Sequence, residues 1–258
     1  MKSSLFAIIL GLGVGTVLLL YLLLIENRPS PATTRVAVAT NFLETLEKLV
    51  QTFEESSEHQ ATIVFGSSGK LYTQIKNGAP IDIFLSADTD RPKRLEQEHL
   101  TVPKTFFVYA VGKLVLWSKD PNLVDANGKI LAAHQFERLA IGPVQVAPYG
   151  AAAKQTLTNL GLWEQLWPRI IQSTNLTHLH QLIDNEEVQL GFLAQSQIVK
   201  QQQVGSQWIV PQELYEPIEQ GAVLLKRGQN NAAALAFIDF LQSAKARAII
   251  EEFSYSVP

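Results

Sequence analysis

The chain has 258 residues, 47% of them hydrophobic and 17% charged, with a formal net charge of −3 at neutral pH. This is an ordinary globular composition, and the length suits one large domain or two smaller ones. The lack of a basic excess argues against a nucleic-acid partner. The absence of cysteine excludes a disulfide framework, a thiolate metal site and a lipid-anchored N-terminal cysteine.

The N-terminus carries one long apolar segment. Residues 5–25, "LFAIILGLGVGTVLLLYLLLI", contain no charged side chain and as a helix would be roughly 30 Å long, about one bilayer core. The apolar core of a signal peptide is shorter, about 7–15 residues, and the sequence offers only a weak cleavage site after Ala32. For residues 1–33, including a short linker, we therefore favour an uncleaved membrane anchor over a cleaved signal peptide. Either one exports the rest of the chain.

From Arg35 onward, strands alternate with helices. Strands are predicted at residues 35–40, 61–67 and 82–88, the last an apolar run typical of a buried parallel strand. Apolar residues at helical spacing between Phe42 and Phe53 predict the first helix, and a shorter helix ends at Asn77-Gly78. This βαβαβ order predicts a doubly wound α/β sheet.

The same layout then begins again. Strands are predicted at residues 113–118, 138–143, 188–196 and 221–228, and helices at 146–161 and 232–253, the last of these interrupted. Residues 169–185 repeat the order of strand, polar break and helix. Two α/β lobes of roughly 100 residues each fit this length.

Four junctions between a strand and a helix stand out, and hydroxyls or an amide stand beside three of them. They are Thr40-Asn41, Gly66–Tyr72 with Ser67 or Ser68 as a cap, Pro148–Gly150, and Asn175-Leu176. Each places backbone N–H groups that lack helical partners, with partial positive charge, at a helix N-terminus. Because ligands of open α/β sheets bind outside the carboxyl ends of the strands, two such junctions from each lobe could surround a small anion.

Each junction taken alone also fits ordinary helix capping, since these residue types are preferred N-caps. Asn41 followed by Glu44, for example, matches an N-cap with a carboxylate three residues on. The stretch "GSSGK" lacks the spacing of a phosphate-binding loop, so we exclude nucleotide binding. His178 and His180 would lie about 200° apart on a helix and would not chelate one metal ion.

Four segments together resemble the periplasmic molybdate-binding proteins of ABC importers. They are "VAVATNFLETLEKL", "FGSSGKLYTQIKNGAPIDIFLSAD", "YAVGKLVLWS" and "IGPVQVAPYGAAAKQTL", and the resemblance extends from about Arg35 to the C-terminus. It implies an α/β, two-lobed periplasmic binding protein fold (type 2), with a doubly wound mixed sheet in each lobe and hinge crossovers near 111–116 and 218–224. Lobe 1 would comprise residues 34–113 and 222–258, and the inserted lobe 2 residues 114–221.

The resemblance also implies a ligand set. The oxyanion contacts would be Thr40, Asn41, Ser68, Tyr149 and, through its backbone N–H, Leu176, with Ser67 as a neighbour that contributes. Some members of the family have a tyrosine where this chain has Ala194, and the sequence leaves open whether Tyr149 replaces that phenol. Molybdenum would be held as the oxyanion, so we expect no directly coordinated metal and no cofactor.

We therefore expect an extracytoplasmic, non-catalytic binding protein, monomeric and periplasmic, anchored to the cytoplasmic membrane if the leader is retained. It would capture molybdate, and tungstate as a near-isostere, in the cleft between the lobes and deliver it to an ABC transporter permease. Three alternatives stay open: a binding protein for sulfate or phosphate, a hydrolase that uses Ser67 or Ser68, and a ligand-sensing domain that signals to a membrane partner.

Overall fold

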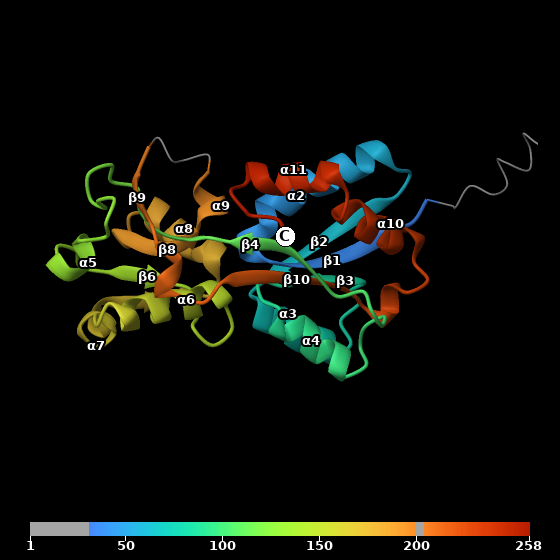
Figure 1. Cartoon of the computed structure of the whole chain (residues 1–258), viewed down its shortest axis with the longest axis horizontal. Helices are drawn as coiled ribbons and strands as arrows, with labels where there is room; N and C mark the ends of the chain where they lie inside the picture. Colours follow the sequence, from blue (N-terminus) through green and yellow to red (C-terminus); the bar gives the residue numbers. More distant parts are fainter. Residues whose placement is uncertain (1–30, 200–203) are drawn as a thin grey trace, which may run out of the picture. The chain divides into compact units, whose positions relative to one another are not determined.

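The structure, a computed structural model, describes residues 31–199 and 204–258. These residues form two five-stranded mixed sheets, with strand orders β2-β1-β3-β10-β4 and β7-β6-β8-β5-β9 (Figure 1). No helix within these ranges is long and apolar enough to cross a membrane. The anchor or signal peptide expected at residues 5–25 lies outside the described residues.

The first sheet is built mainly from the N-terminal part of the chain. Its strands are β1 (Thr33–Ala39), β2 (Gln60–Gly66), β3 (Ile83–Leu85), β4 (Phe107–Gly112) and β10 (Ile218–Leu224). Its helices are η1 (Thr40–Phe42), α2 (Leu43–Ser56), α3 (Ser68–Lys76), α4 (Asp90–Gln97), η4 (Lys226–Gly228), α10 (Ala232–Leu241) and α11 (Ala244–Glu252). β1 runs parallel to β2 and β3, whereas β10 runs antiparallel to β3 and β4.

The second sheet uses only the intervening chain. Its strands are β5 (Leu114–Ser118), β6 (Leu139–Ile141), β7 (Ile170–Gln172), β8 (Leu190–Ala194) and β9 (Ser206–Ile209). Its helices are α5 (Ile130–Ala133), α6 (Pro148–Asn159), α7 (Trp163–Leu166), η2 (Trp167–Arg169), α8 (Leu176–Asp184), α9 (Gln195–Ile198) and η3 (Gln212–Leu214). β6 is parallel to β7 and β8, and β5 is antiparallel to β8 and β9.

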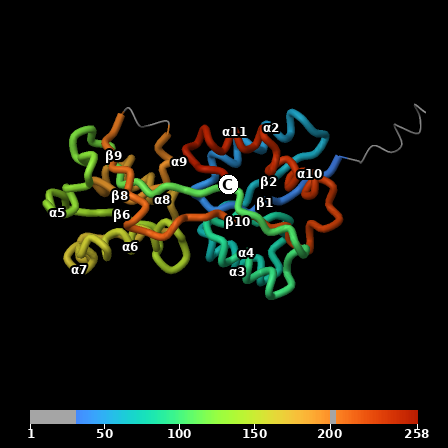
Figure 2. The backbone as a smooth tube through the Cα atoms, in the orientation of Figure 1, coloured from blue at the N-terminus to red at the C-terminus, as the bar shows by residue number. Residues whose placement is uncertain are grey.

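The chain crosses between the two sheets twice, as Figure 2 lets the reader follow. The first crossing is short, because only Lys113 separates β4 from β5. The second lies between the end of β9 and the start of β10, at residues 210–217, and so slightly before the expected range of 218–224. The C-terminus ends beside the first crossing, where Ser256 bridges Val111.

Each sheet of this α/β fold buries apolar side chains under its helices. In the first lobe, α2, α10 and α11 cover one face, and α3 and α4 cover the other (Figure 1). Leu46, Leu49 and Phe53 of α2 are buried because three- and four-residue spacing keeps side chains on one helix face. The Phe53 ring meets the Phe237 ring of α10 edge-on, at a centroid distance of 5.1 Å.

The predicted strands and helices coincide with the observed ones to within a few residues. The expected interruption of the C-terminal helix falls between α10 and α11, where the Ser243 hydroxyl accepts the Ala246 N–H and caps α11. Strands β4 and β9 and helices α4, α5, α7 and α9 were not predicted. β9 has only four residues, and α4 begins Asp-Arg-Pro-Lys and has few apolar residues to mark a helical period.

The Asp82 carboxylate connects the first sheet to helix α10. The side chain is 3% exposed and accepts hydrogen bonds from the Arg35 N–H at 2.9 Å and from Asn231 Nδ2 at 3.3 Å. Arg227 Nε lies 3.1 Å from its other oxygen. Since Asn231 also caps α10, one carboxylate holds the β1 and β3 edges and the start of α10 in register.

Replacing this carboxylate should destabilise the fold. Asp82→Ala leaves several buried donors without an acceptor, and each such loss costs about 1–3 kcal/mol; we expect the free energy of unfolding to fall by about 2–3 kcal/mol. Urea denaturation measures it, with Asp239→Ala on the exposed side of α10 as the control, which should change stability by less than about 0.5 kcal/mol. Equal stability of the two variants would contradict this role for Asp82.

Candidate functional site

The four predicted junctions all lie where a strand leads into a helix. Thr40 begins the η1 turn directly after β1, and Ser67 occupies the N-cap position between β2 and α3. Pro148 is the first residue of α6, and Asn175 is the N-cap of α8. The six residues predicted to contact the anion are all buried, with between 1% and 5% of their surface exposed: Thr40, Asn41, Ser67, Ser68, Tyr149 and Leu176.

Helix capping by the side chain is observed at the fourth junction but not at the first. The Asn175 side chain accepts the His178 N–H at 2.9 Å, so it is a helix cap. The prediction that Asn41 is an N-cap is wrong, because the η1 turn comes first and Phe42 occupies the N-cap position of α2. The Asn41 side chain instead turns toward the second crossing and donates to Gln220 Oε1 at 2.8 Å.

The junctions of one lobe touch those of the other. The Leu176 N–H at the start of α8 donates to the Thr40 hydroxyl oxygen, at 3.3 Å. The Gly69 N–H in the first turn of α3 donates to the carbonyl of Val146, just before α6, at 2.9 Å. The first junction therefore meets the fourth, and the second meets the third, which brings together helix N-termini from both lobes.

Hydroxyl groups at these contacts keep a hydrogen to donate. Thr40 Oγ1 accepts from Leu176, and Ser68 Oγ accepts from the Ala87 N–H at 2.9 Å, at the end of β3. A hydroxyl that accepts through its oxygen still has its own hydrogen free. Ser67 Oγ is buried and has no hydrogen-bond partner in the described part of the chain.

Tyr149 reaches from the second lobe to the first crossing. Its side chain is 1% exposed, and its hydroxyl lies so close to Gly112 of β4 that a Cβ atom there would be 1.9 Å from the oxygen. Burial, with smaller contributions from Tyr255 and Tyr109, raises the pKa of Tyr149 well above that of an ordinary phenol. The group therefore stays neutral and protonated at physiological pH, when it can still donate a hydrogen bond.

Three buried groups of this region can donate but have no hydrogen-bond partner among residues 31–199 and 204–258. They are Ser67 Oγ, Tyr149 Oη and Gln220 Nε2. Buried polar groups normally have partners, because an unpaired one costs free energy. Because Ser67 Oγ and Tyr149 Oη lie beside helix N-termini, with no carboxylate in the predicted contact set, they are free to donate to an anion.

Sequence reasoning missed three residues that hold Asn41. Gln220 Oε1 accepts from its side chain, and Tyr255 Oη and Ser196 Oγ donate to its carbonyl at 2.8 and 2.9 Å. They come from β10, the C-terminal segment and α9 of the second lobe. Only Gln220 carries a local signal: a Gln-Gly pair inside an apolar strand suggests a bulge.

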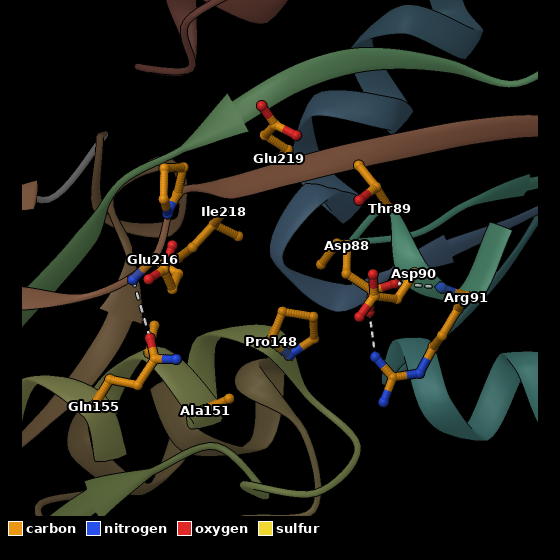
Figure 3. Close-up of a pocket in the computed structure, with 13 residues that line it drawn as sticks. Asp88, Thr89, Asp90, Arg91, Pro148, Ala151, Gln155, Glu216, Ile218 and Glu219 are labelled. Atoms are coloured by element: carbon orange, nitrogen blue, oxygen red, sulfur yellow. Dashed lines mark hydrogen bonds and ion pairs between the residues drawn. The ribbon is translucent and has the colours of Figure 1, made fainter. Parts of the chain in front are cut away.

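A separate cavity of about 360 Å³ lies between the two lobes beside the second crossing (Figure 3). Four carboxylates line it, from Asp88, Asp90, Glu216 and Glu219, and its one cation, Arg91, is paired with Asp88. None of the six predicted contact residues lines it. An acidic lining repels anions, so this cavity is poorly suited to an anion.

The described residues give no support to metal binding or to an activated serine. Within them, no group of three His, Asp or Glu side chains is placed to hold a metal ion. His178 Nδ1 contacts Thr174, and the His180 ring packs edge-on against Trp117. Ser68 Oγ accepts a backbone N–H, so neither it nor the unpartnered Ser67 is seen paired with a general base, as a nucleophilic serine would be.

Residues 34–256 match the family described as bacterial extracellular solute-binding protein, and the chain belongs to this family. A molybdate-binding protein of Azotobacter vinelandii is 40% identical over the full length of both chains. One of Rhodobacter capsulatus is 44% identical over 85% of this chain and 86% of its own. A solved structure of the Azotobacter vinelandii periplasmic molybdate-binding protein superposes with a TM-score of 0.84 at 42% identity, covering 87% of this chain and 99% of that one. The predicted two-lobed periplasmic binding protein fold is confirmed.

Adding one methyl group at the first crossing should disturb the site. Gly112→Ala places a Cβ atom 1.9 Å from Tyr149 Oη and 3.1 Å from Gln220 Nε2, so the phenol, and with it the start of α6, must move. We expect oxyanion binding, measured by calorimetry with molybdate, to weaken at least tenfold. In the double variant Gly112→Ala/Tyr149→Phe the clashing oxygen is gone, and part of the affinity should return. Wild-type affinity in Gly112→Ala would show that this contact is not needed.

Proposed function

We propose that this protein is an extracytoplasmic substrate-binding protein that captures molybdate between its lobes and delivers it to an ABC transporter permease. One observation carries the proposal: buried helix N-termini and hydroxyl donors from both lobes meet, with no carboxylate in the contact set. The molybdate-binding relatives, which match along nearly the whole described chain, support the choice of ligand. Tungstate, a near-isostere, should bind as well.

The six contact residues act in different ways. Thr40, Ser67 and Ser68 would donate through hydroxyl hydrogens. Leu176 would donate through its backbone N–H, which in this structure bonds to Thr40 Oγ1 and would turn from it to the anion. Asn41 would contribute its backbone N–H, because both hydrogens of its side-chain amide are used by Gln220 and Tyr255. Tyr149 lies at the second position of α6, where its backbone N–H lacks a helical acceptor. The partial positive charge of the helix N-termini adds to each of these bonds.

A site of this kind selects against protonated oxyanions. Phosphate at neutral pH carries at least one hydroxyl hydrogen, which needs an acceptor, and the contact set offers no carboxylate. A donor facing another donor leaves buried groups unpaired, at about 1–3 kcal/mol each. Sulfate carries no proton but is smaller, so a site shaped for the larger tetrahedron would leave some donors without a partner.

The remaining parts of the proposal concern the whole protein. Residues 1–33 would be a membrane anchor or signal peptide, lobe 1 residues 34–113 and 222–258, and lobe 2 residues 114–221. The protein would act as a monomer in the periplasm. It would bind without catalysis and need no cofactor; the unactivated serines favour this over a hydrolase that uses Ser67 or Ser68.

Calorimetry with four anions tests the ligand. Molybdate and tungstate should bind at least a hundredfold more tightly than sulfate or phosphate, a difference of roughly 2.7 kcal/mol by the affinity relation. The same solutions should be tested for hydrolysis of phosphate and acyl esters, which a binding protein does not catalyse. Equal affinities for sulfate and molybdate would refute the proposed specificity.

Ser68 allows a test of a single contact residue. Ser68→Ala removes one hydroxyl donor to a dianion, worth about 1.5–3 kcal/mol, so molybdate should bind at least tenfold more weakly. Ser57→Ala is the matched control, since Ser57 lies at the far end of α2 and bonds to His59, and it should leave affinity within about twofold. Unchanged affinity in Ser68→Ala would limit Ser68 to its bond with Ala87.

A further inference from the structure

Strand β10 contains one fully buried polar side chain, Gln220, at the point where its pairing changes. Its relative exposure is 0%, and the register with β4 shifts between Gln220 and Gly221. Two backbone hydrogen bonds from the segment after β3 hold this register shift in place. The Ser86 N–H donates to the Gly221 carbonyl at 2.9 Å, and the Gly221 N–H donates to the Asp88 carbonyl at 3.2 Å. An irregularity of this kind re-aims a side chain, and here Gln220 turns toward Asn41.

The carbonyl oxygen of Gln220 is fully used. Oε1 accepts from Asn41 Nδ2 at 2.8 Å and from Tyr109 Oη at 3.1 Å, which fills the two lone pairs of an amide oxygen. Gln220 Nε2 faces the region of Gly112 and Tyr149 Oη and has no partner in the described part of the chain. This one side chain therefore stands between the first junction and the hydroxyl that reaches over from the second lobe.

Asn41 depends on such contacts because its own turn is short. η1 has three residues, and a single turn of 3₁₀-helix is weakly determined by its own hydrogen bonds. Asn41 is held by its neighbours instead: its amide donates to Gln220 and Tyr255, and its carbonyl accepts from Tyr255 and Ser196. Fixing the two ends of the residue fixes the direction of its backbone N–H.

We propose that Gln220 is a positioning residue of the anion site, which acts through Asn41 and links β10, the strand just after the second crossing, to the first strand-to-helix junction. This rests on the proposed function, since it assigns Gln220 a part in the same site. Gln220 holds the Asn41 amide, and the held amide keeps the backbone N–H groups of the η1 turn directed at the anion. Because Gln220 belongs to a strand that leads from one lobe to the other, the geometry of the crossing and of the turn are coupled.

A double-mutant cycle on the full chain tests the route through Asn41. Gln220→Met keeps the length of the side chain and removes its acceptor, and molybdate affinity should fall at least tenfold by calorimetry. Asn41→Ala should also weaken binding. The double variant Gln220→Met/Asn41→Ala should bind within about twofold of Asn41→Ala alone, because residues that act through one another are not additive. Full additivity, or wild-type affinity in Gln220→Met, would overturn the proposal.

Two controls separate positioning from general stability. Tyr109→Phe removes the other hydrogen bond to the same Gln220 oxygen, and Gln207→Met replaces a glutamine in β9 of the second lobe. Both should stay within about threefold of wild-type affinity, whatever their melting temperatures. A loss in Tyr109→Phe equal to that in Gln220→Met would mean that any damage to this buried network suffices, and the role assigned to Asn41 would be wrong.

The outcomes also distinguish this proposal from the proposed function. If Gln220→Met does not fold, Gln220→Asn, which shortens the side chain and withdraws the same acceptor, takes its place in the cycle with the same expectations. If wild-type protein binds another oxyanion in preference to molybdate, the ligand assignment fails, and the cycle measured with that anion still decides the role of Gln220. If no oxyanion binds, both proposals are refuted.

Discussion

The first N–H groups of a helix have no acceptors within the helix, and this constraint shapes the centre of the molecule. Four strand-to-helix junctions bring such groups to the facing edges of two sheets. Some find acceptors in the opposite lobe, as the Leu176 and Gly69 N–H groups do. The others lie beside buried hydroxyls that still have a hydrogen to donate. On the proposed function, the oxygens of a tetrahedral oxyanion would accept from these donors.

Beside each of the two crossings lies a residue that supports a member of the predicted contact set. Gly112, at the end of β4 just before the first crossing, leaves room for the Tyr149 hydroxyl, and Gln220, in β10 just after the second, holds Asn41. Both positions therefore connect a strand that passes between the lobes to a residue in the predicted contact set. Bending at either crossing would move these buried side chains, so the geometry of the crossings and that of the proposed site would be coupled.

Much of this could be predicted from the sequence, and the reasons differ from part to part. The β1–α2 unit is marked by a change from alternating to helical apolar spacing, and local pattern suffices to find it. The six contact residues were expected from the resemblance to molybdate-binding proteins, whereas the sequence pattern alone located only the strand-to-helix junctions. All six are buried. The role of the Asn41 side chain was misjudged because its partners, Gln220 and Tyr255, lie 179 and 214 residues away. Distant pairing of this kind leaves no local signal.

On the proposed function, the charges of the described residues favour short-range bonds to the ligand. The protein is net negative, the cavity beside the second crossing is lined by four carboxylates, and Lys70, one residue from Gly69, is exposed. At physiological salt, exposed charges are screened beyond about 8–10 Å, so neither attraction nor repulsion from the surface reaches the centre strongly. Inside, the contact residues are at most 5% exposed, and low permittivity strengthens each N–H and O–H bond to an anion. Affinity then comes from the number and direction of donors. That is why residues such as Gln220, which direct a donor without touching the anion, should affect binding as much as the donors themselves.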